Sequence, residues 1–240
     1  MLGGVMDWWR GRALGEAGRA RIALEKSYPG VSFGTDVQVI GLDTIRIGVG
    51  SCIGDRVWLN DCMRNEPGRL EIGRFTLIGR GGVITTSGRL QIGDFVVLGP
   101  DVYVADADHI FTDPMQPILQ QGVTTGRSVI IEENCWLGIH AKIFGDLTVG
   151  RGSIVAAGSI VRKSVPPFAV VAGVPAKVVK LYDFSVREWR PVRDESELAD
   201  MLQMRELHPV PERNAYHDIL HRENRVAPLE RLLAGANCSI

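Results

Sequence analysis

One histidine stands in a run of residues that could carry acid–base chemistry, Asp106-Ala-Asp-His109. Imidazole gains and loses a proton near neutral pH, so His109 could act as a general base toward a hydroxyl group. Asp106 and Asp108 could orient the ring, although such pairs as often solvate a loop and cap its turns. From the residues alone, a loop histidine bonded to solvent or to a backbone carbonyl remains the alternative.

The other histidines give no metal-ligand pattern. A zinc site built from histidines needs three convergent rings, and only His109 and His140 lie within the repeats described below. His217 and His221 are four residues apart and would share one face of a helix, but the sequence shows no third ligand beside them. We therefore expect no metal and interpret this pair as part of a solvated helix face.

The elements that must position these residues are repeats of six amino acids. Aliphatic residues recur at every sixth position in five triplets, which begin at residues 47, 72, 92, 131 and 149. This period fits neither an amphipathic helix nor a sandwich, whose turns come every 8–12 residues without a fixed phase. It fits a β-solenoid in which each hexapeptide supplies a short strand and a turn, and three hexapeptides close a triangular coil. The clearest run is Ile131, Leu137, Ile143, Val149, Val155 and Val161.

The phase of the repeat breaks at a few places, and the longest break lies next to His109. Val104 and Ile131 are 27 residues apart, which is one step of six plus 21 extra residues. We therefore expect residues 107–127 to leave the coil as a loop and to return. Insertions in solenoids gather on one face, which is often the binding face.

This organisation divides the chain into three parts. Residues 31–180 are predicted to form the solenoid, with about six to seven triangular coils and the loop insertion. Residues 1–30 are predicted to be an N-terminal helical segment, since residues 6–28 have apolar residues at helical spacing and Pro29-Gly30 follows.

Residues 181–240 are charged and leucine-rich and predict a helical C-terminal tail. We expect the two ends to cap the solenoid, because an open end would expose strand edges that can pair with other chains. The helices expected in the tail span residues 195–207, 215–221 and 227–234.

Composition narrows the class of protein. Hydrophobic residues make up 45% and charged residues 23% of the chain, as in ordinary globular proteins, and a net charge of −1 gives no support for a nucleic-acid binder. No run of 18 apolar residues predicts a transmembrane helix, and the first residues do not read as a signal peptide. The four scattered cysteines lack CxxC spacing, so we interpret them as reduced thiols of a cytoplasmic protein.

Further motifs accompany the repeats and Asp106-Ala-Asp-His109. They are Pro117-Ile, Gln121-Gly, Asn134-Cys-Trp-Leu-Gly138, Gly150-Arg-Gly-Ser153, Ala157-Gly-Ser-Ile-Val161, Val165-Pro-Pro167 and Ala172-Gly-Val-Pro-Ala-Lys177. With these motifs, residues 30 to 180 resemble the hexapeptide-repeat acyltransferase superfamily. The closest resemblance is to the branch of galactoside, maltose and polysaccharide O-acetyltransferases. The resemblance implies an all-β solenoid that winds as a left-handed parallel β-helix, a hand that periodicity alone does not give.

The resemblance also implies acetyl-CoA as co-substrate and assigns roles to residues. His109 would be the catalytic general base. The pantetheine arm and the nucleotide phosphates would contact Trp136, Gly138, Ile139, Ala157, Lys163, Lys177 and Lys180. Substrate-binding candidates are Asp106, Asp108 and Gln121. Taken singly, each lysine is more often a surface lysine, and Trp136 could instead be a stacking cap.

The predicted function is that of an acetyl-CoA-dependent O-acetyltransferase that acts on a sugar hydroxyl of a polysaccharide or glycan precursor. No Cys or Ser is placed as a covalent nucleophile, so we expect direct transfer within a ternary complex. One solenoid face offers no second wall for a CoA groove, and relatives place that groove between subunits, so we expect a homotrimer.

The sequence departs from the small-sugar enzymes in one place. They carry an asparagine on an earlier coil that orients the acceptor, whereas the corresponding stretch here is Ile78-Gly-Arg-Gly81. This departure favours a larger glycan, or a lipid-linked or nucleotide-linked sugar. Two alternatives stay open: an N-acetyltransferase of a nucleotide-linked amino sugar, and a non-catalytic β-helix that serves as an assembly subunit.

Overall fold

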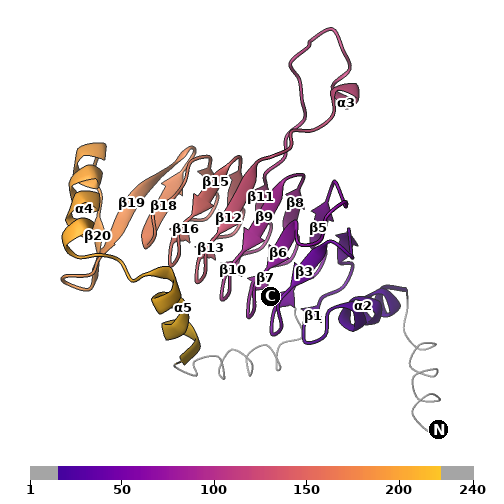
Figure 1. Ribbon diagram of the computed structural model, residues 1–240, viewed down its shortest axis with the longest axis horizontal. Coiled ribbons are helices and arrows are strands. Elements are labelled where there is room, and N and C mark those ends of the chain that lie inside the picture. The colour runs from indigo at the N-terminus through magenta and orange to yellow at the C-terminus, as the bar shows by residue number, and fades with distance from the viewer. Residues whose placement is uncertain (1–15, 223–240) are drawn as a thin grey trace.

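The computed structural model describes residues 16–222, and its body is a triangular parallel β-helix (Figure 1). Each short strand hydrogen-bonds to the strands one coil before and one coil after it, which builds three parallel sheets, named here sheets A, B and C. Sheet A contains β1 (Ser32–Phe33), β4 (Cys52–Ile53), β7 (Leu77–Ile78), β10 (Val97–Leu98), β13 (Trp136–Leu137), β16 (Ile154–Val155) and β18 (Ala169–Gly173).

Sheets B and C complete the triangle. Sheet B contains β2 (Gln38–Ile40), β5 (Trp58–Asp61), β8 (Val83–Thr86), β11 (Tyr103–Ala105), β14 (Lys142–Phe144) and β17 (Ile160–Val161). Sheet C contains β3 (Ile45–Ile47), β6 (Leu70–Ile72), β9 (Arg89–Ile92), β12 (Ser128–Ile131) and β15 (Leu147–Val149).

The aliphatic residues that recur at every sixth position in the sequence are the residues that fill the core. Leu98 pairs with Leu137 and Leu137 with Val155 in the ladder of sheet A, and all three side chains are fully buried. Full burial of one such side chain contributes about 1.5–3 kcal/mol. Truncation of Leu137 to alanine would leave a cavity between two neighbouring coils, at a cost of about 2–5 kcal/mol.

The segment between β11 and β12 projects from the body as a loop that carries the short helix α3 (Ile118–Gln121) (Figure 1). Its stem is tied by an antiparallel bridge between His109 and Val123. The helix α2 (Glu16–Ser27) precedes the first coil and is followed by the buried Tyr28. The part of the expected N-terminal helix before residue 16 lies outside the described residues.

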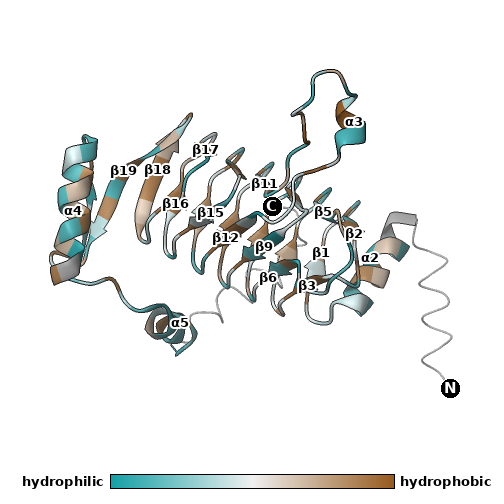
Figure 2. Cartoon of the chain, turned by 45° about the horizontal axis from the view of Figure 1, so that its top comes forward, coloured by the Kyte–Doolittle hydropathy of each residue, from teal (hydrophilic) through white to brown (hydrophobic). Residues whose placement is uncertain are grey.

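The expectation of a wholly helical tail is wrong for its first part. β19 (Ala176–Asp183) pairs antiparallel with β18, and β20 (Glu188–Pro191) pairs with β19, so sheet A continues beyond the coils. The physical reason is the free edge of β18, which β19 covers with backbone hydrogen bonds. In Figure 2, β18 is largely brown, whereas α4 at the end of the molecule carries both teal and brown residues.

Two helices follow β20. α4 (Glu195–Leu207) has the bounds indicated by the sequence, and its first turn is capped by Asp194, whose carboxylate accepts the Glu197 N–H at 2.9 Å. α5 (Arg213–Arg222) includes the second expected helix. The third expected helix, at 227–234, lies outside the described residues. None of the helices between residues 16 and 222 has the length and apolar character needed to cross a membrane.

The cysteines differ from the expectation of reduced thiols. Cys62 and Cys135 are free, but Cys52 is disulfide-bonded. Spacing along the sequence does not reveal such pairing, because the fold decides which sulfur atoms meet. The cysteines therefore no longer argue for a reducing compartment.

Candidate active site

His109 lies at the stem of the projecting loop, with its imidazole exposed. Its backbone N–H donates to Oδ1 of Asp108 at 2.9 Å. Within residues 16–222, no side chain or backbone group hydrogen-bonds to the ring, and the nearest pairing is the backbone bridge to Val123. Both ring nitrogens are therefore available to a bound molecule.

Asp106 does not orient this ring, because both of its carboxylate oxygens are already bonded. The side chain is buried and accepts hydrogen bonds from Thr86 Oγ1 at 2.6 Å, from Ser87 N–H at 2.8 Å and from Gly88 N–H at 3.0 Å. These three groups belong to the end of β8 and the turn that follows it, one coil earlier. Asp106 therefore anchors the beginning of the insertion to the β-helix.

Gln121 is likewise committed within the loop. Its Nε2 donates to the carbonyls of Asp113 at 2.8 Å and Gln116 at 3.1 Å, and its Oε1 accepts the Asp113 N–H at 3.1 Å. The side chain thus holds α3 against the outgoing strand of the loop. Of the three substrate-binding candidates, only the exposed Asp108 has a carboxylate next to His109.

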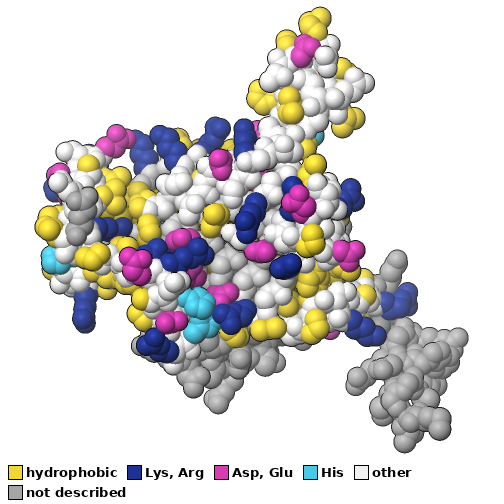
Figure 3. Space-filling view, viewed as in Figure 1, with side chains coloured by type: hydrophobic (Ala, Val, Ile, Leu, Met, Phe, Trp, Pro, Cys, Tyr) yellow, Lys and Arg dark blue, Asp and Glu magenta, His cyan; other side chains and the backbone are white. Residues whose placement is uncertain are grey.

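Two of the three predicted phosphate-binding lysines line a cavity of about 1040 Å³ at the far end of the coils. Lys163 and Lys177 both line it, whereas Lys180 does not. Arg162 and Arg193 bring the number of lining cations to four, against the two carboxylates of Asp194 and Glu195. A surplus of cations around an open cavity suits a phosphorylated ligand. Figure 3 shows a row of Lys and Arg side chains along the edge between α4 and the projecting loop.

His109 and Lys163 belong to the same edge of sheet B. The insertion follows β11 and the pair Arg162–Lys163 follows β17, and these strands are separated only by β14. Two strand spacings correspond to about 10 Å along the axis of the β-helix. An extended ligand lying parallel to this axis could therefore reach both residues.

Ile139 and Ala157 lie on the opposite edge of sheet B, where it meets sheet A. Within the described residues, their backbone N–H groups donate to no backbone carbonyl, so both can bind a ligand. Successive coils stack closely at this corner because the residues beneath these nitrogens are glycines. A Cβ atom on Gly99 would lie 2.7 Å from the Ile139 nitrogen, and a Cβ atom on Gly138 would lie 2.6 Å from the Ala157 nitrogen.

Trp136 is separate from these residues. It lies on the outer face of sheet A, in register with Val97 and Ile154, and is 54% exposed. The structure thus brings Gly138, Ile139 and Ala157 to one corner and leaves Trp136 beside that corner on an apolar face.

The motif comparison missed a group of polar residues on sheet B. Nδ2 of Asn60 lies 3.0 Å from Thr85 Oγ1 and 3.2 Å from Cys62 Sγ. Burial, followed by the charges of Asp108 and Cys62, raises the pKa of Tyr103 on the neighbouring strand β11. The signal was present in the sequence, because Asn60 and Thr85 each follow an inward-pointing aliphatic residue and pair in the ladder.

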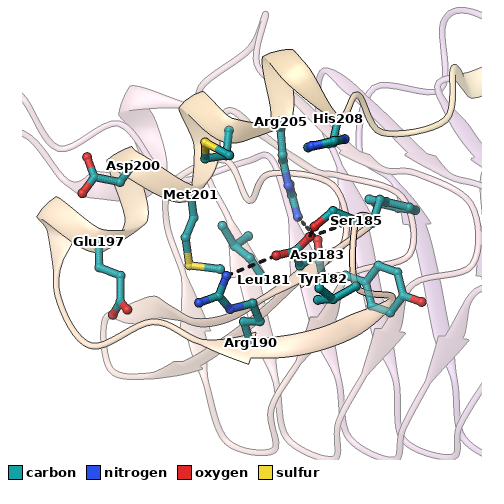
Figure 4. Close-up of a pocket in the computed structure, with 13 residues that line it drawn as sticks. Leu181, Tyr182, Asp183, Ser185, Arg190, Glu197, Asp200, Met201, Arg205 and His208 are labelled. Atoms are coloured by element: carbon teal, nitrogen blue, oxygen red, sulfur yellow. Dashed lines mark hydrogen bonds and ion pairs between the residues drawn. The ribbon is translucent and has the colours of Figure 1, made fainter.

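A second cavity, of about 370 Å³, lies between β19, β20 and α4 (Figure 4). Arg205 donates to the carbonyls of Phe168 at 3.0 Å and of Tyr182 at 3.2 Å. A hydrogen bond from the Ser185 side chain is the main cause that lowers the pKa of Asp183 to about 2, and Arg190 adds to it. The Arg205 contacts attach α4 to the end of the β-helix, and the Asp183 contacts join β19 to β20 and their turn.

The fold and the repeats define this protein as a β-helix of the hexapeptide type. No family model matches the sequence. A probable acetyltransferase of Mycobacterium tuberculosis is 33% identical over 139 residues, which cover 58% of this chain and 45% of the relative. A protein of Escherichia coli, provisionally named a lipopolysaccharide biosynthesis O-acetyl transferase, is 33% identical over 99 residues, or 39% of this chain and 50% of the relative.

The chain therefore spans about half the length of these relatives. Among solved structures, a variant of AntD, an N-acyltransferase from Bacillus cereus in complex with dTDP and coenzyme A, matches with a TM-score of 0.52 and 20% identity. The match covers 77% of this chain and 96% of AntD, and together with the parallel sheets it fits a left-handed β-helix. These acetyltransferase relatives and this fold support a relationship to the hexapeptide-repeat acyltransferase superfamily.

Proposed function

We propose that the protein is an acetyl-CoA-dependent O-acetyltransferase that acts on a sugar hydroxyl of a polysaccharide or glycan precursor. The observation that carries the proposal is the position of His109: its ring is exposed and unbonded within the described residues, on the same edge of sheet B as Lys163. The acetyltransferase names of the two relatives support the same reaction class.

In the proposed mechanism, His109 takes the proton of the acceptor hydroxyl as its oxygen attacks the thioester carbonyl carbon. The C–O bond forms, the C–S bond breaks, and the CoA thiolate leaves and is protonated. Cys135 is a poor candidate for a covalent nucleophile, because it is fully buried and burial raises the pKa of its thiol to about 12. A nucleophilic cysteine would need a lowered pKa and access to substrate.

The donor would lie along sheet B. Its phosphates would bind at the cavity of Lys163 and Lys177, with Lys180 nearby on β19, and the pantetheine amides would meet the N–H groups of Ile139 and Ala157. One sheet leaves such a ligand open to water on its other side. We therefore propose a homotrimer in which a neighbouring subunit, through an apolar face such as that of Trp136, closes the groove.

The acceptor is proposed to be larger than a simple sugar. The Asn60–Thr85 pair lies on sheet B before the His109 loop and offers polar groups to a hydroxylated ligand. A nucleotide-linked amino sugar as acceptor would make the reaction an N-acetylation with the same base. We propose a cytoplasmic location, since the reaction consumes acetyl-CoA.

The test is acceptor-dependent release of CoA thiol, measured with acetyl-CoA and a panel of glycans, lipid-linked and nucleotide-linked sugars, and their amino-sugar counterparts. Mass spectrometry and alkaline treatment of the product distinguish an ester, which is hydrolysed, from an amide, which survives. The proposal expects one ester formed per thiol released. Stable amide products would assign the N-acetyl reaction, and no release with any acceptor would support a non-catalytic subunit.

A further inference from the structure

Two histidines of α5 meet an aspartate of the β-helix, contrary to the expectation of a solvated helix face. Nε2 of His221 lies 3.1 Å and Nε2 of His217 lies 3.4 Å from Oδ2 of Asp94. Asp94 lies at the corner after β9, more than 120 residues earlier in the chain. The fold thus supplies the third group that the sequence alone did not show.

The spacing of the three atoms is that of metal ligands. All three lie within 4.8 Å of one another. Zinc binds histidine nitrogen and carboxylate oxygen at about 2.0–2.2 Å, so two ligands of a tetrahedral site are about 3.3–3.5 Å apart. The separations of 3.4 Å between His217 Nε2 and Asp94 Oδ2 and of 3.1 Å between His221 Nε2 and Asp94 Oδ2 are close to this value. Histidines four residues apart on a helix are a recurrent way to present two such ligands on one face.

Hydrogen bonds cannot account for every close contact in this cluster at once. Nη2 of Arg74 lies 2.9 Å from Oδ2 of Asp94, 3.3 Å from Nε2 of His217 and 3.2 Å from Nε2 of His221. A guanidinium nitrogen of this kind has two protons and no acceptor, so it cannot donate to all three atoms. An Nε2 that accepts from Arg74 has its lone pair on that side and cannot also donate to Asp94.

A divalent cation removes this conflict, because it binds the lone pairs of both imidazoles and of the carboxylate together. Arg74 then has to leave, and its side chain is 45% exposed, so it has room to turn toward solvent. Its backbone N–H donates to the other carboxylate oxygen of Asp94 at 2.7 Å, which would keep the carboxylate oriented after the guanidinium has moved.

The surroundings fix the ligands while leaving a route for an ion. The ring of His221 packs 4.8 Å from the ring of Phe95, which stacks on Phe75. The side chains of His217, His221 and Asp94 are 39%, 23% and 15% exposed, so an ion could enter from solvent. Figure 3 shows histidine side chains at the position of α5, among basic and acidic neighbours.

We propose that Asp94, His217 and His221 form a binding site for Zn²⁺, which clamps α5 onto the corner between sheets C and A. Two nitrogen ligands and one oxygen ligand suit zinc among the common biological divalent ions. Water takes the fourth position, which Arg74 holds when the ion is absent. The site is separate from the His109 edge, so the zinc proposal does not depend on the proposed acetyl transfer.

The experiment uses untagged full-length protein, stripped with chelator and titrated with ZnCl₂ by calorimetry. The expected result is one Zn²⁺ per chain and a thermal midpoint that rises with zinc concentration, because binding to the folded state stabilises it. His217→Asn should weaken binding at least about tenfold, and the exposed His208→Asn, which lies outside the cluster, should not change it.

The variant Arg74→Gln distinguishes a metal site from an alternative in which hydrogen bonds alone hold α5 against Asp94. Removal of a competing positive charge should tighten zinc binding about tenfold at low salt. If hydrogen bonds alone hold α5, the same substitution would only weaken the attachment of the helix. With Co²⁺ as probe, the visible absorption of a tetrahedral site should appear in the wild type and vanish in His217→Asn. Absence of saturable binding, binding unchanged in His217→Asn, or weaker binding in Arg74→Gln would each overturn the proposal.

Discussion

His109 and Val123 form an antiparallel bridge across the base of the projecting loop, so the imidazole is held at the stem of the loop and not at its tip. Beside the bridge, the Thr124 N–H donates to the Asp108 carbonyl at 2.8 Å. The position of the ring relative to sheet B therefore depends on a few stem contacts, which can be removed singly.

Thr124 is the stem residue to test first. Its Oγ1 accepts the Asp108 N–H at 2.9 Å, and valine would keep the shape while removing the acceptor. A hydrogen bond of about 0.5–1.5 kcal/mol corresponds to about two- to tenfold in rate. In steady-state kinetics, Thr124→Val should lower kcat by that factor and leave the KM for acetyl-CoA unchanged. An unchanged kcat would mean that the stem does not position the base.

Asp106 should matter for stability. Asp106→Ala leaves the N–H groups of Ser87 and Gly88 and the buried Thr86 hydroxyl without their acceptor, at a cost of about 3 kcal/mol, which lowers Tm by about 6–12 °C in a chain of this size. The exposed Asp108→Ala is the matched control and should shift stability by less than about 0.5 kcal/mol. Calorimetry of both variants tests this difference in stability, and equal Tm values would contradict the anchoring role of Asp106.

Lys177 should contribute to donor binding and not to chemistry. Because the side chain is exposed at the rim of its cavity, Lys177→Ala should raise the KM for acetyl-CoA about three- to tenfold with little change in kcat. Lys26→Ala, on α2 at the other end of the molecule, is the control. The increase should shrink with a donor that lacks the nucleotide phosphates, and a fall in kcat alone would assign Lys177 another role.

Much of this arrangement is predictable from the sequence, because a coil repeats every three hexapeptides. The inward positions of Leu98, Leu137 and Val155 follow from the six-residue phase alone. The break in that phase also marks the loop that carries His109. The hydrophobic effect sets such positions locally, so they can be read without knowledge of distant contacts.

Contacts between distant segments are not predictable in this way. Asp106 and Asp108 are alike in sequence, yet only Asp106 is drawn into the coil by the turn at Ser87. Asp94 meets His217 and His221 only because β19, β20 and α4 return the chain to that corner. The Asn60–Thr85 pair belongs to no sequence motif, because its two residues meet only through the pairing of β5 with β8.

Cys135 gives a prediction for alkaline solution. Burial raises the pKa of its thiol to about 12, whereas an unfolded cysteine has a pKa of about 8.5. Between these values the unfolded chain releases a proton that the folded chain keeps, so stability should fall by up to about 1.4 kcal/mol per pH unit above pH 8.5. Denaturant titrations from pH 7 to 10 should show a smaller decrease for Cys135→Ala. An identical slope in Cys135→Ala and the wild type would contradict the assignment.

The measurement that tests the central claim most directly is single-turnover acetyl transfer by His109→Ala and His109→Asn. Loss of a general base costs about 10²–10⁴ in rate, so both variants should transfer acetyl at least about a hundredfold more slowly, since an amide cannot take a proton at neutral pH. They should retain wild-type affinity for acetyl-CoA and wild-type Tm, because the ring is exposed and its backbone carries the stem contacts. A variant that keeps more than about a tenth of the wild-type rate of the chemical step would show that His109 is not the base.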